Sequence, residues 1–158
     1  MSQAISPARD PLGRPFDRNL AYRFARVQAK LNAQASRLLM REAGISLTQW
    51  RMLLTIGSLK GGRLSDIVRE STLDKGQVSR TLKKMVADGL VDRQAIEGDQ
   101  RASGLSLTKK GQSLLDRVLP LMTRRRDHLT ASLTATELDA VFRILGKLET
   151  SAEADAFP

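Results

Sequence analysis

The helical periodicity of this chain has one interruption, and that interruption constrains the fold more than any other feature. Apolar residues recur at three- and four-residue steps before Gly89 and again after Thr108, a spacing that predicts amphipathic helices. Between them, residues 90–96 and 105–107 are predicted to be two short strands, joined by the polar segment 97–104 as a hairpin tip. The predicted order is four helices, a β-hairpin and two more helices, which is a mainly α fold with one small hairpin.

Local signals predict where the helices begin and end. Gly44 and Gly89 are expected to stop the first and fourth helices, and Gly61-Gly62 to break the chain after the second. Pro120 is expected to kink the fifth helix. Asp74 with Gln77, and Thr134 with Glu137, have the spacing of capping boxes. The expected N-cap residues are Thr48, Ser65, Asp74, Thr108 and Thr134.

The composition limits the class of protein. The chain has 158 residues and a formal net charge of +9, which favours a polyanionic partner such as nucleic acid or an anionic membrane surface. There is no cysteine, and His128 is the single histidine, so disulfides and thiolate or multi-histidine metal sites are not expected. No apolar run approaches 18 residues and residues 1–17 lack a signal sequence, so we expect a cytoplasmic protein without a membrane span.

The sequence favours a binding protein over an enzyme. No nucleophile–base–acid set, no cluster of metal ligands and no phosphate-binding glycine loop is visible along the chain. We therefore predict no catalysis, no metal and no cofactor.

Residues 64–108 carry the functional pattern. A short helix, a three-residue turn and a second helix predict a helix-turn-helix, and the hairpin that follows makes it a winged helix-turn-helix. The N-terminal residues of the second helix of such a unit enter the major groove of DNA. Arginine and lysine can pair there with guanine and glutamine with adenine, while cations further along the helix suit phosphates. The predicted contacts from these two helices are Ser65, Lys75, Gln77, Ser79, Arg80, Lys83 and Lys84.

Charge alone leaves a second interpretation open. Residues 63–104 hold eight Lys or Arg against seven Asp or Glu, so only the fourth helix, and not the whole region, is strongly basic. A solvated basic helix face would look the same.

Three segments resemble the multiple-antibiotic-resistance regulator (MarR) family. SLTQWRMLLTI is similar to the family's second helix, and LDKGQVSRTLKKMVADGLVDR to its recognition helix and first wing strand. GDQRASGLSLTKKG resembles the family's wing, with the pattern Asp-x-Arg followed by Leu-x-Leu-Thr-x-x-Gly. The residues that match this pattern are Asp99, Arg101, Leu105, Leu107, Thr108 and Gly111. The resemblance covers residues 20–148.

The resemblance implies a DNA-binding transcriptional regulator, commonly a repressor released by a small molecule. Arg101 at the wing tip would reach into the minor groove, with Asp99 holding it; alternatively the two form only a turn-stabilising ion pair. The implied organisation is a flexible arm (1–18), a MarR-type winged helix-turn-helix domain (19–150) and an acidic tail (151–158). Within the domain, 46–108 would be the DNA-binding lobe, and 19–45 and 109–150 the dimerisation helices.

The resemblance also implies a homodimer on an inverted-repeat operator. The expected dimer seam consists of Leu20, Phe24, Leu129, Val141, Phe142, Leu145 and Leu148, and an intramolecular bundle is the alternative. Arg124-Arg125-Arg126 would be either a solvated run or a set of partners for acids on the second subunit.

A small anionic or aromatic effector is the third implied partner. The candidate contacts are Tyr22, Arg26, Trp50, Arg51 and His128, since arginine clamps carboxylates and aromatic rings stack. The alternatives are that Trp50 belongs to the core, Arg26 to the surface and His128 to the structure. A winged-helix module for protein or RNA contacts, without ligand sensing, remains the alternative function. It is disfavoured because the basic helix face is kept and residues 74–104 contain no aromatic residue for stacking on RNA.

Overall fold

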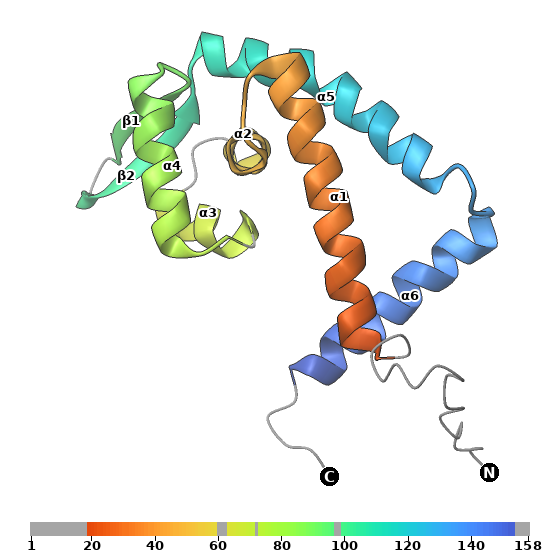
Figure 1. The fold of residues 1–158 in the computed structure, drawn as a ribbon. Helices are drawn as coiled ribbons and strands as arrows, with labels where there is room; N and C mark the ends of the chain where they lie inside the picture. The colour runs from red at the N-terminus through yellow and green to blue at the C-terminus, as the bar shows by residue number, and fades with distance from the viewer. Residues whose placement is uncertain (1–18, 60–62, 72, 97–98, 154–158) are drawn as a thin grey trace. The chain divides into compact units, whose positions relative to one another are not determined.

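The computed structural model describes residues 19–59, 63–71, 73–96 and 99–153, without the side chains of Ser71 and of residues 94–96 and 99–103. The expected mainly α fold with one hairpin is confirmed (Figure 1). Residue contacts divide the chain into two compact units, with the boundary between Leu115 and Asp116. The elements are α1 (Leu20–Ala43), α2 (Leu47–Leu59), α3 (Leu64–Ser71), α4 (Lys75–Ala87), β1 (Val91–Ile96), β2 (Asp99–Leu107), α5 (Lys109–Thr130) and α6 (Ala135–Ala152).

Helix α2 is the centre of the first unit. It contacts α1, α3, α4 and β2, so α2 and these four elements share one core. Trp50 is 4% exposed and belongs to this core, in line with the structural interpretation of its helical spacing. On α3, Ile67 is fully buried and Val68 is half-buried. The largest fully buried side chains of this unit are Leu39, Met52, Leu53, Ile56, Ile67, Val78, Leu82, Met85, Val91 and Leu105.

Two glycines end helices as the sequence predicts. Gly44 has φ of +65° and donates its N–H to Met40 O at 3.1 Å, which closes α1. Gly89 has φ of +68° and follows α4, and the next residue, Leu90, donates to Met85 O at 2.9 Å. Both positions require the left-handed conformation that glycine adopts without strain.

The predicted N-cap of α2 was wrong by two residues. The helix begins at Leu47, and Ser46 caps it, because the Gln49 N–H donates to Ser46 Oγ at 3.1 Å. The Ser46 N–H in turn donates to Gln49 Oε1 at 2.9 Å, which completes a capping box. Thr48 therefore lies in the first turn of the helix. Ser46 is the cap and Thr48 is not, because Gln49, three residues after Ser46, can exchange hydrogen bonds with it.

The predicted N-cap of α3 was also wrong. The helix begins at Leu64, so Ser65 lies inside its first turn. The carboxylate of Asp66 accepts the Arg63 N–H at 3.0 Å, and the Asp66 N–H donates to Arg63 O at 3.0 Å. The carboxylate of Asp66, in the first turn, thus accepts the backbone N–H that precedes the helix, where the sequence predicted a serine cap.

The caps of α5 and α6 are confirmed. Thr108 Oγ1 accepts the Gly111 N–H at 3.0 Å at the start of α5. At α6, Thr134 Oγ1 accepts the Glu137 N–H at 3.3 Å, and Glu137 Oε2 accepts the Thr134 N–H at 2.8 Å. The second pair is a complete capping box.

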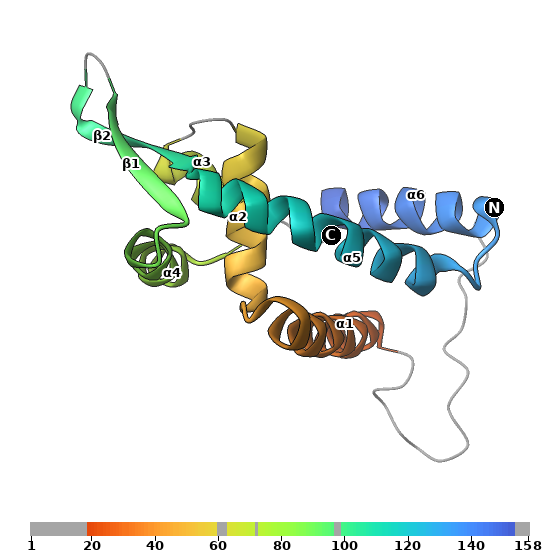
Figure 2. The ribbon, with the colours of Figure 1, turned by 90° about the horizontal axis from the view of Figure 1, so that it is seen from above.

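The hairpin is longer than predicted. Strands β1 and β2 pair antiparallel from Val91 opposite Leu107, and Gly104 also bridges to Arg63 (Figure 2). Strand β1 begins one residue later than expected, and residues 99–104 form strand where the sequence predicted the hairpin tip. Backbone hydrogen bonds pair strands whatever the side chains are. Residues 99–104 therefore form a strand although they lack the apolar alternation by which strands are recognised in a sequence. Residues 97–98 lie outside the described part.

The second unit contains the end of α5 and all of α6. A turn joins them, in which the Leu133 N–H donates to Thr130 O at 2.9 Å. Helix α5 includes Pro120, and α6 continues to Ala152, two residues into the predicted acidic tail. Helix α6 buries none of its residues in one protomer. Among the helices that the structure describes, none is long and apolar enough to cross a membrane.

Candidate nucleic-acid interface

The two helices of the helix-turn-helix are α3 and α4. Their buried sides are Ile67 on α3 and Val78, Leu82 and Met85 on α4, all of which are at most 1% exposed. This core contact fixes α4, so the opposite face of α4 points away from the lobe. The buried residues follow the helical periodicity of α4, and its polar residues are left for a partner.

The N-terminal turn of α4 has a defined geometry. Asp74 Oδ1 accepts the Gln77 N–H at 2.8 Å, which confirms the predicted cap. An ideal Cβ built on Gly76 would lie 3.2 Å from Asp74 Oδ1 and 3.4 Å from Arg80 Nη1. The Arg80 guanidinium therefore reaches back over the first turn, the end of such a helix that enters the major groove.

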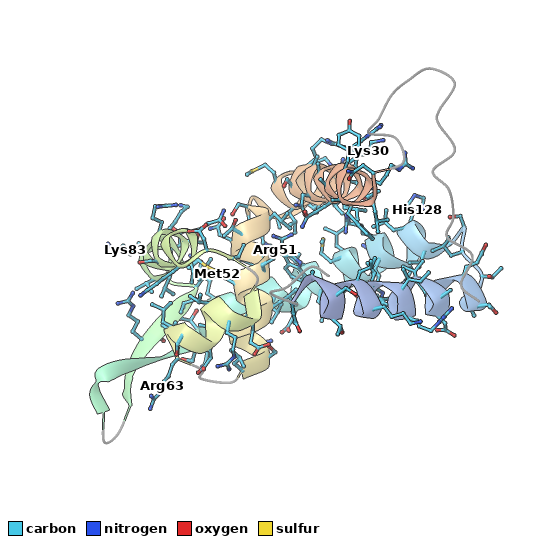
Figure 3. The ribbon with its side chains drawn as sticks, turned by 90° about the horizontal axis from the view of Figure 1, so that it is seen from below. Lys30, Arg51, Met52, Arg63, Lys83 and His128 are labelled. Atoms are coloured by element: carbon cyan, nitrogen blue, oxygen red, sulfur yellow. The ribbon has the colours of Figure 1, made fainter. Side chains whose placement is uncertain are left out.

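The cations of α4 are accessible. Lys75, Arg80, Lys83 and Lys84 are exposed, and Lys83 points outward from the core around Met52 (Figure 3). Lys84 Nζ lies 3.3 Å from Asp88 Oδ2, with the two side chains 66% and 38% exposed, so this ion pair is weak. Helix α4 itself contains no acidic residue. The other predicted contacts are placed as follows: Ser65 is exposed on α3, while Gln77 and Ser79 are half-buried on α4.

A groove of about 440 Å³ lies where the end of α1, the start of α2 and the middle of α4 meet. Arg80 and Lys84 line one side of it, and Gln49, which is 7% exposed, lines another. The sequence did not predict this groove, because no spacing along the chain links residue 49 to residue 84. The complete lining is Met40, Gly44, Ser46, Gln49, Arg80, Thr81 and Lys84.

The base of the wing is joined to the end of α4. Thr108 Oγ1 donates to Gly89 O at 2.7 Å, and the Thr108 N–H donates to Leu90 O at 3.1 Å. An ideal Cβ on Gly111 would lie 2.0 Å from Leu90 O, so only glycine fits at this position. The Leu-x-Leu-Thr-x-x-Gly pattern therefore has a structural role, which is to hold the wing and α5 against the recognition helix.

The wing residues Asp99 and Arg101 remain predictions. Both belong to β2, and their side chains lie outside the described part of the structure. Lys110 is an addition that the sequence did not suggest. Its Nζ donates to Asp88 O at 2.8 Å, a second link between α5 and the end of α4.

The four effector candidates of the first unit lie in two separate places. Arg26 lies 5.8 Å from the centroid of the Tyr22 ring, near the start of α1. Arg51 Nη2 donates to Asn32 Oδ1 at 2.9 Å. Asn32 lies about 15 Å from Tyr22 along α1, at 1.5 Å per residue. The buried Trp50 is beside Arg51 on α2, while His128 is exposed and belongs to the second unit. None of the five lines the groove at α4.

No group of three or more metal-ligating side chains gathers within the described residues. What the site offers is a convex, cationic helix beside a two-stranded wing. Such a surface fits an extended polyanion and has no enclosed reaction centre.

The helix-turn-helix and the hairpin directly after it define a winged helix-turn-helix protein. Residues 43–102 match the model of the MarR family. The HTH-type transcriptional regulator BilQ of Clostridium symbiosum is 29% identical over 115 residues, which cover 73% of this chain and 80% of BilQ. The chain is therefore similar to MarR family transcriptional regulators, which are not enzymes.

Solved structures agree with this family. A MarR/EmrR family regulator from Acinetobacter sp. ADP1 superimposes with a TM-score of 0.82 at 26% identity, over 89% of this chain and 99% of that one. The regulator MOSR of Mycobacterium tuberculosis, solved in complex with DNA, gives a TM-score of 0.71 at 29% identity, over 87% of this chain and 98% of MOSR.

Proposed function

We propose that this regulator binds an inverted-repeat operator as a homodimer and represses transcription until a small ligand releases it. The observation that carries the proposal is the exposed face of α4, which has four cations and no acid and stands beside the wing. MOSR, a protein of similar fold, was solved in complex with DNA, which supports DNA binding by this chain.

The residues of α4 divide by position. Gln77 and Arg80 lie in the first two turns of α4 and would read base edges in the major groove. Lys83 and Lys84 lie one turn further along and would bind phosphates, which fixes the register of the helix on the duplex. Arg101 would enter the minor groove, where a narrow A·T-rich stretch has the most negative potential.

The homodimer is supported by the apolar side chains that one protomer leaves exposed. Leu20 and Phe24 on α1 are 53% and 41% exposed, and Val141 and Phe142 on α6 are 41% and 64% exposed. A soluble monomer rarely exposes so many large apolar residues on its end helices. The other members of the proposed seam, Leu129, Leu145 and Leu148, are half-buried.

For the effector we propose a small anionic or aromatic molecule bound beside Arg51. This guanidinium is half-buried and already links α2 to α1 through Asn32. A ligand carboxylate that recruited Arg51 would therefore compete with a contact between the α1 helix and the DNA-binding lobe.

A footprint on the DNA upstream of the gene for this protein tests the operator geometry. Two recognition helices related by a two-fold axis should protect two inverted half-sites whose centres are about 10 base pairs apart, or a multiple of that spacing. Protection of one asymmetric half-site would refute the homodimer on DNA. Absence of any protected site would favour a winged-helix module that contacts proteins.

A further inference from the structure

The positive charge of the first unit is concentrated on two helices, α4 and α1. Residues 63–104 hold eight cations and seven acids, so the reading region has an excess of only one charge. Helix α1 has five cations and one acid, Glu42, an excess of four. Because long-range attraction to DNA depends on net positive charge, a large part of it must arise on α1.

All five cations of α1 lie on one side of the helix. At about 100° per residue they fall within an arc of about 60°, and they span about 27 Å along the axis. Helix α5 also has excess positive charge, but consecutive cations such as Arg124, Arg125 and Arg126 are spread around its axis. We call the set on α1 the α1 basic face: Arg23, Arg26, Lys30, Arg37 and Arg41.

The α1 basic face is accessible and only lightly paired within the protomer. All five residues are exposed. Arg41 pairs with Glu42 at 2.7 Å, and the two side chains are 71% and 44% exposed. Arg23, Lys30 and Arg37 form no ion pair with any other described residue. Lys30 points outward from the lobe, as Lys83 does on α4 (Figure 3).

This face is continuous with the recognition helix. The groove between α1, α2 and α4 is lined at one end by Met40 and Gly44 of α1, which flank Arg41 in sequence. At the other end it is lined by Arg80 and Lys84 of α4. The α1 basic face therefore ends at Arg41, whose neighbours in sequence line a groove that two cations of α4 also line.

We propose that the α1 basic face is a second DNA-binding surface, which holds the sugar-phosphate backbone next to the bases that α4 reads. The proposal rests on α4 binding duplex DNA. A stripe of about 27 Å matches about eight base pairs at 3.4 Å each, and exposed cations on long side chains can follow either strand. The contact carries no sequence information, so it adds affinity and accelerates association without changing the operator.

The test is the double variant Lys30→Ala/Arg37→Ala, titrated against operator and scrambled duplexes at several salt concentrations. Both residues are exposed and alanine favours helix, so the fold should persist. We expect affinity for both duplexes to fall by the same factor. The slope of log affinity against log salt should become shallower by about two units per half-site, one for each lost phosphate contact. The control is Arg143→Ala/Lys147→Ala on α6, which removes the same charge from exposed positions and should leave the slope unchanged.

An unchanged slope in the double variant would overturn the proposal. If Lys83→Ala weakens DNA binding while the double variant does not, only the α1 contact fails; if neither variant weakens it, the proposed function fails as well. Dissociation of the dimer by the double variant, seen by light scattering, would assign the face to a second copy of the chain. Loss of binding to anionic vesicles with normal DNA binding would assign it to a membrane surface. Both of these results would refute the DNA contact.

Discussion

At the scale of single residues, Gly111 shows how one position determines the placement of the wing. An added Cβ would lie 2.0 Å from Leu90 O, a backbone atom that cannot rotate away. We expect Gly111→Ala to lower the free energy of unfolding by about 1–3 kcal/mol or more, the cost of overpacking. Urea unfolding measures it, with Ser113→Ala as the control, because Ser113 is exposed on the same helix and should change stability by about 0.5 kcal/mol at most. Equal stability of the two variants would contradict the close contact.

The sequence contained this glycine as part of a family-like pattern but gave no reason for it. Its partner, the carbonyl of Leu90, is 21 positions earlier in the chain, and spacing does not reveal contacts of that range. The same limit applies to Arg51 with Asn32 and to the groove at α4. By contrast, the buried side of α4 was predictable from its periodicity alone, because one helix carries the whole pattern.

At the scale of elements, two hydroxyl residues compete to cap α2, and the structure favours Ser46. Its Oγ accepts the Gln49 N–H, whereas Thr48 lies inside the helix. Ser46→Ala should therefore cost about 1 kcal/mol of stability, and Thr48→Ala clearly less. Thermal unfolding of the two variants decides between them, and a larger loss for Thr48→Ala would restore the sequence-based assignment.

The capping box of α6 predicts a pH dependence. Hydrogen bonds from the backbone and the side chain of Thr134 lower the pKa of Glu137 below its ordinary value of 4.5. A carboxylate whose pKa is depressed in the folded state adds stability above its unfolded pKa, and this stability is lost as the pH falls through the folded value. The stability difference between the wild type and Glu137→Gln should thus be constant near neutral pH and shrink on acidification below 4.5. Urea midpoints across that range measure it, and a difference that grows in acid would contradict the cap.

Helix ends with strong local sequence signals were predictable, whereas the full length of the hairpin was not. Gly44, Gly89, Thr108 and Thr134 set helix ends through contacts with near neighbours in the chain. Residues 99–104 of β2 pair through the backbone, and their composition resembles a loop.

At the scale of the whole molecule, the exposed apolar residues of α1 and α6 are the basis of the proposed homodimer. Leu145→Glu/Leu148→Glu should break the dimer or unfold the chain, because an obligate dimer has no stable monomer. Lys147→Glu is the matched control, since Lys147 is exposed and lies on the other side of α6. Light scattering is the measurement. A folded wild-type monomer at micromolar concentration would contradict the homodimer.

Recognition of DNA by α4 is the central claim, and comparison of Arg80→Ala with Lys84→Ala tests it most directly. Each variant is titrated against operator and scrambled duplexes at several salt concentrations. Arg80→Ala should weaken operator binding by about 1–3 kcal/mol per half-site and relax the preference at one base position. Lys84→Ala should weaken both duplexes about equally and make the salt dependence shallower by about one unit per half-site. If Arg80→Ala weakened both duplexes by the same factor, Arg80 would be a phosphate contact. Unchanged binding in both variants would contradict the account, because α4 would then not be the DNA-binding surface.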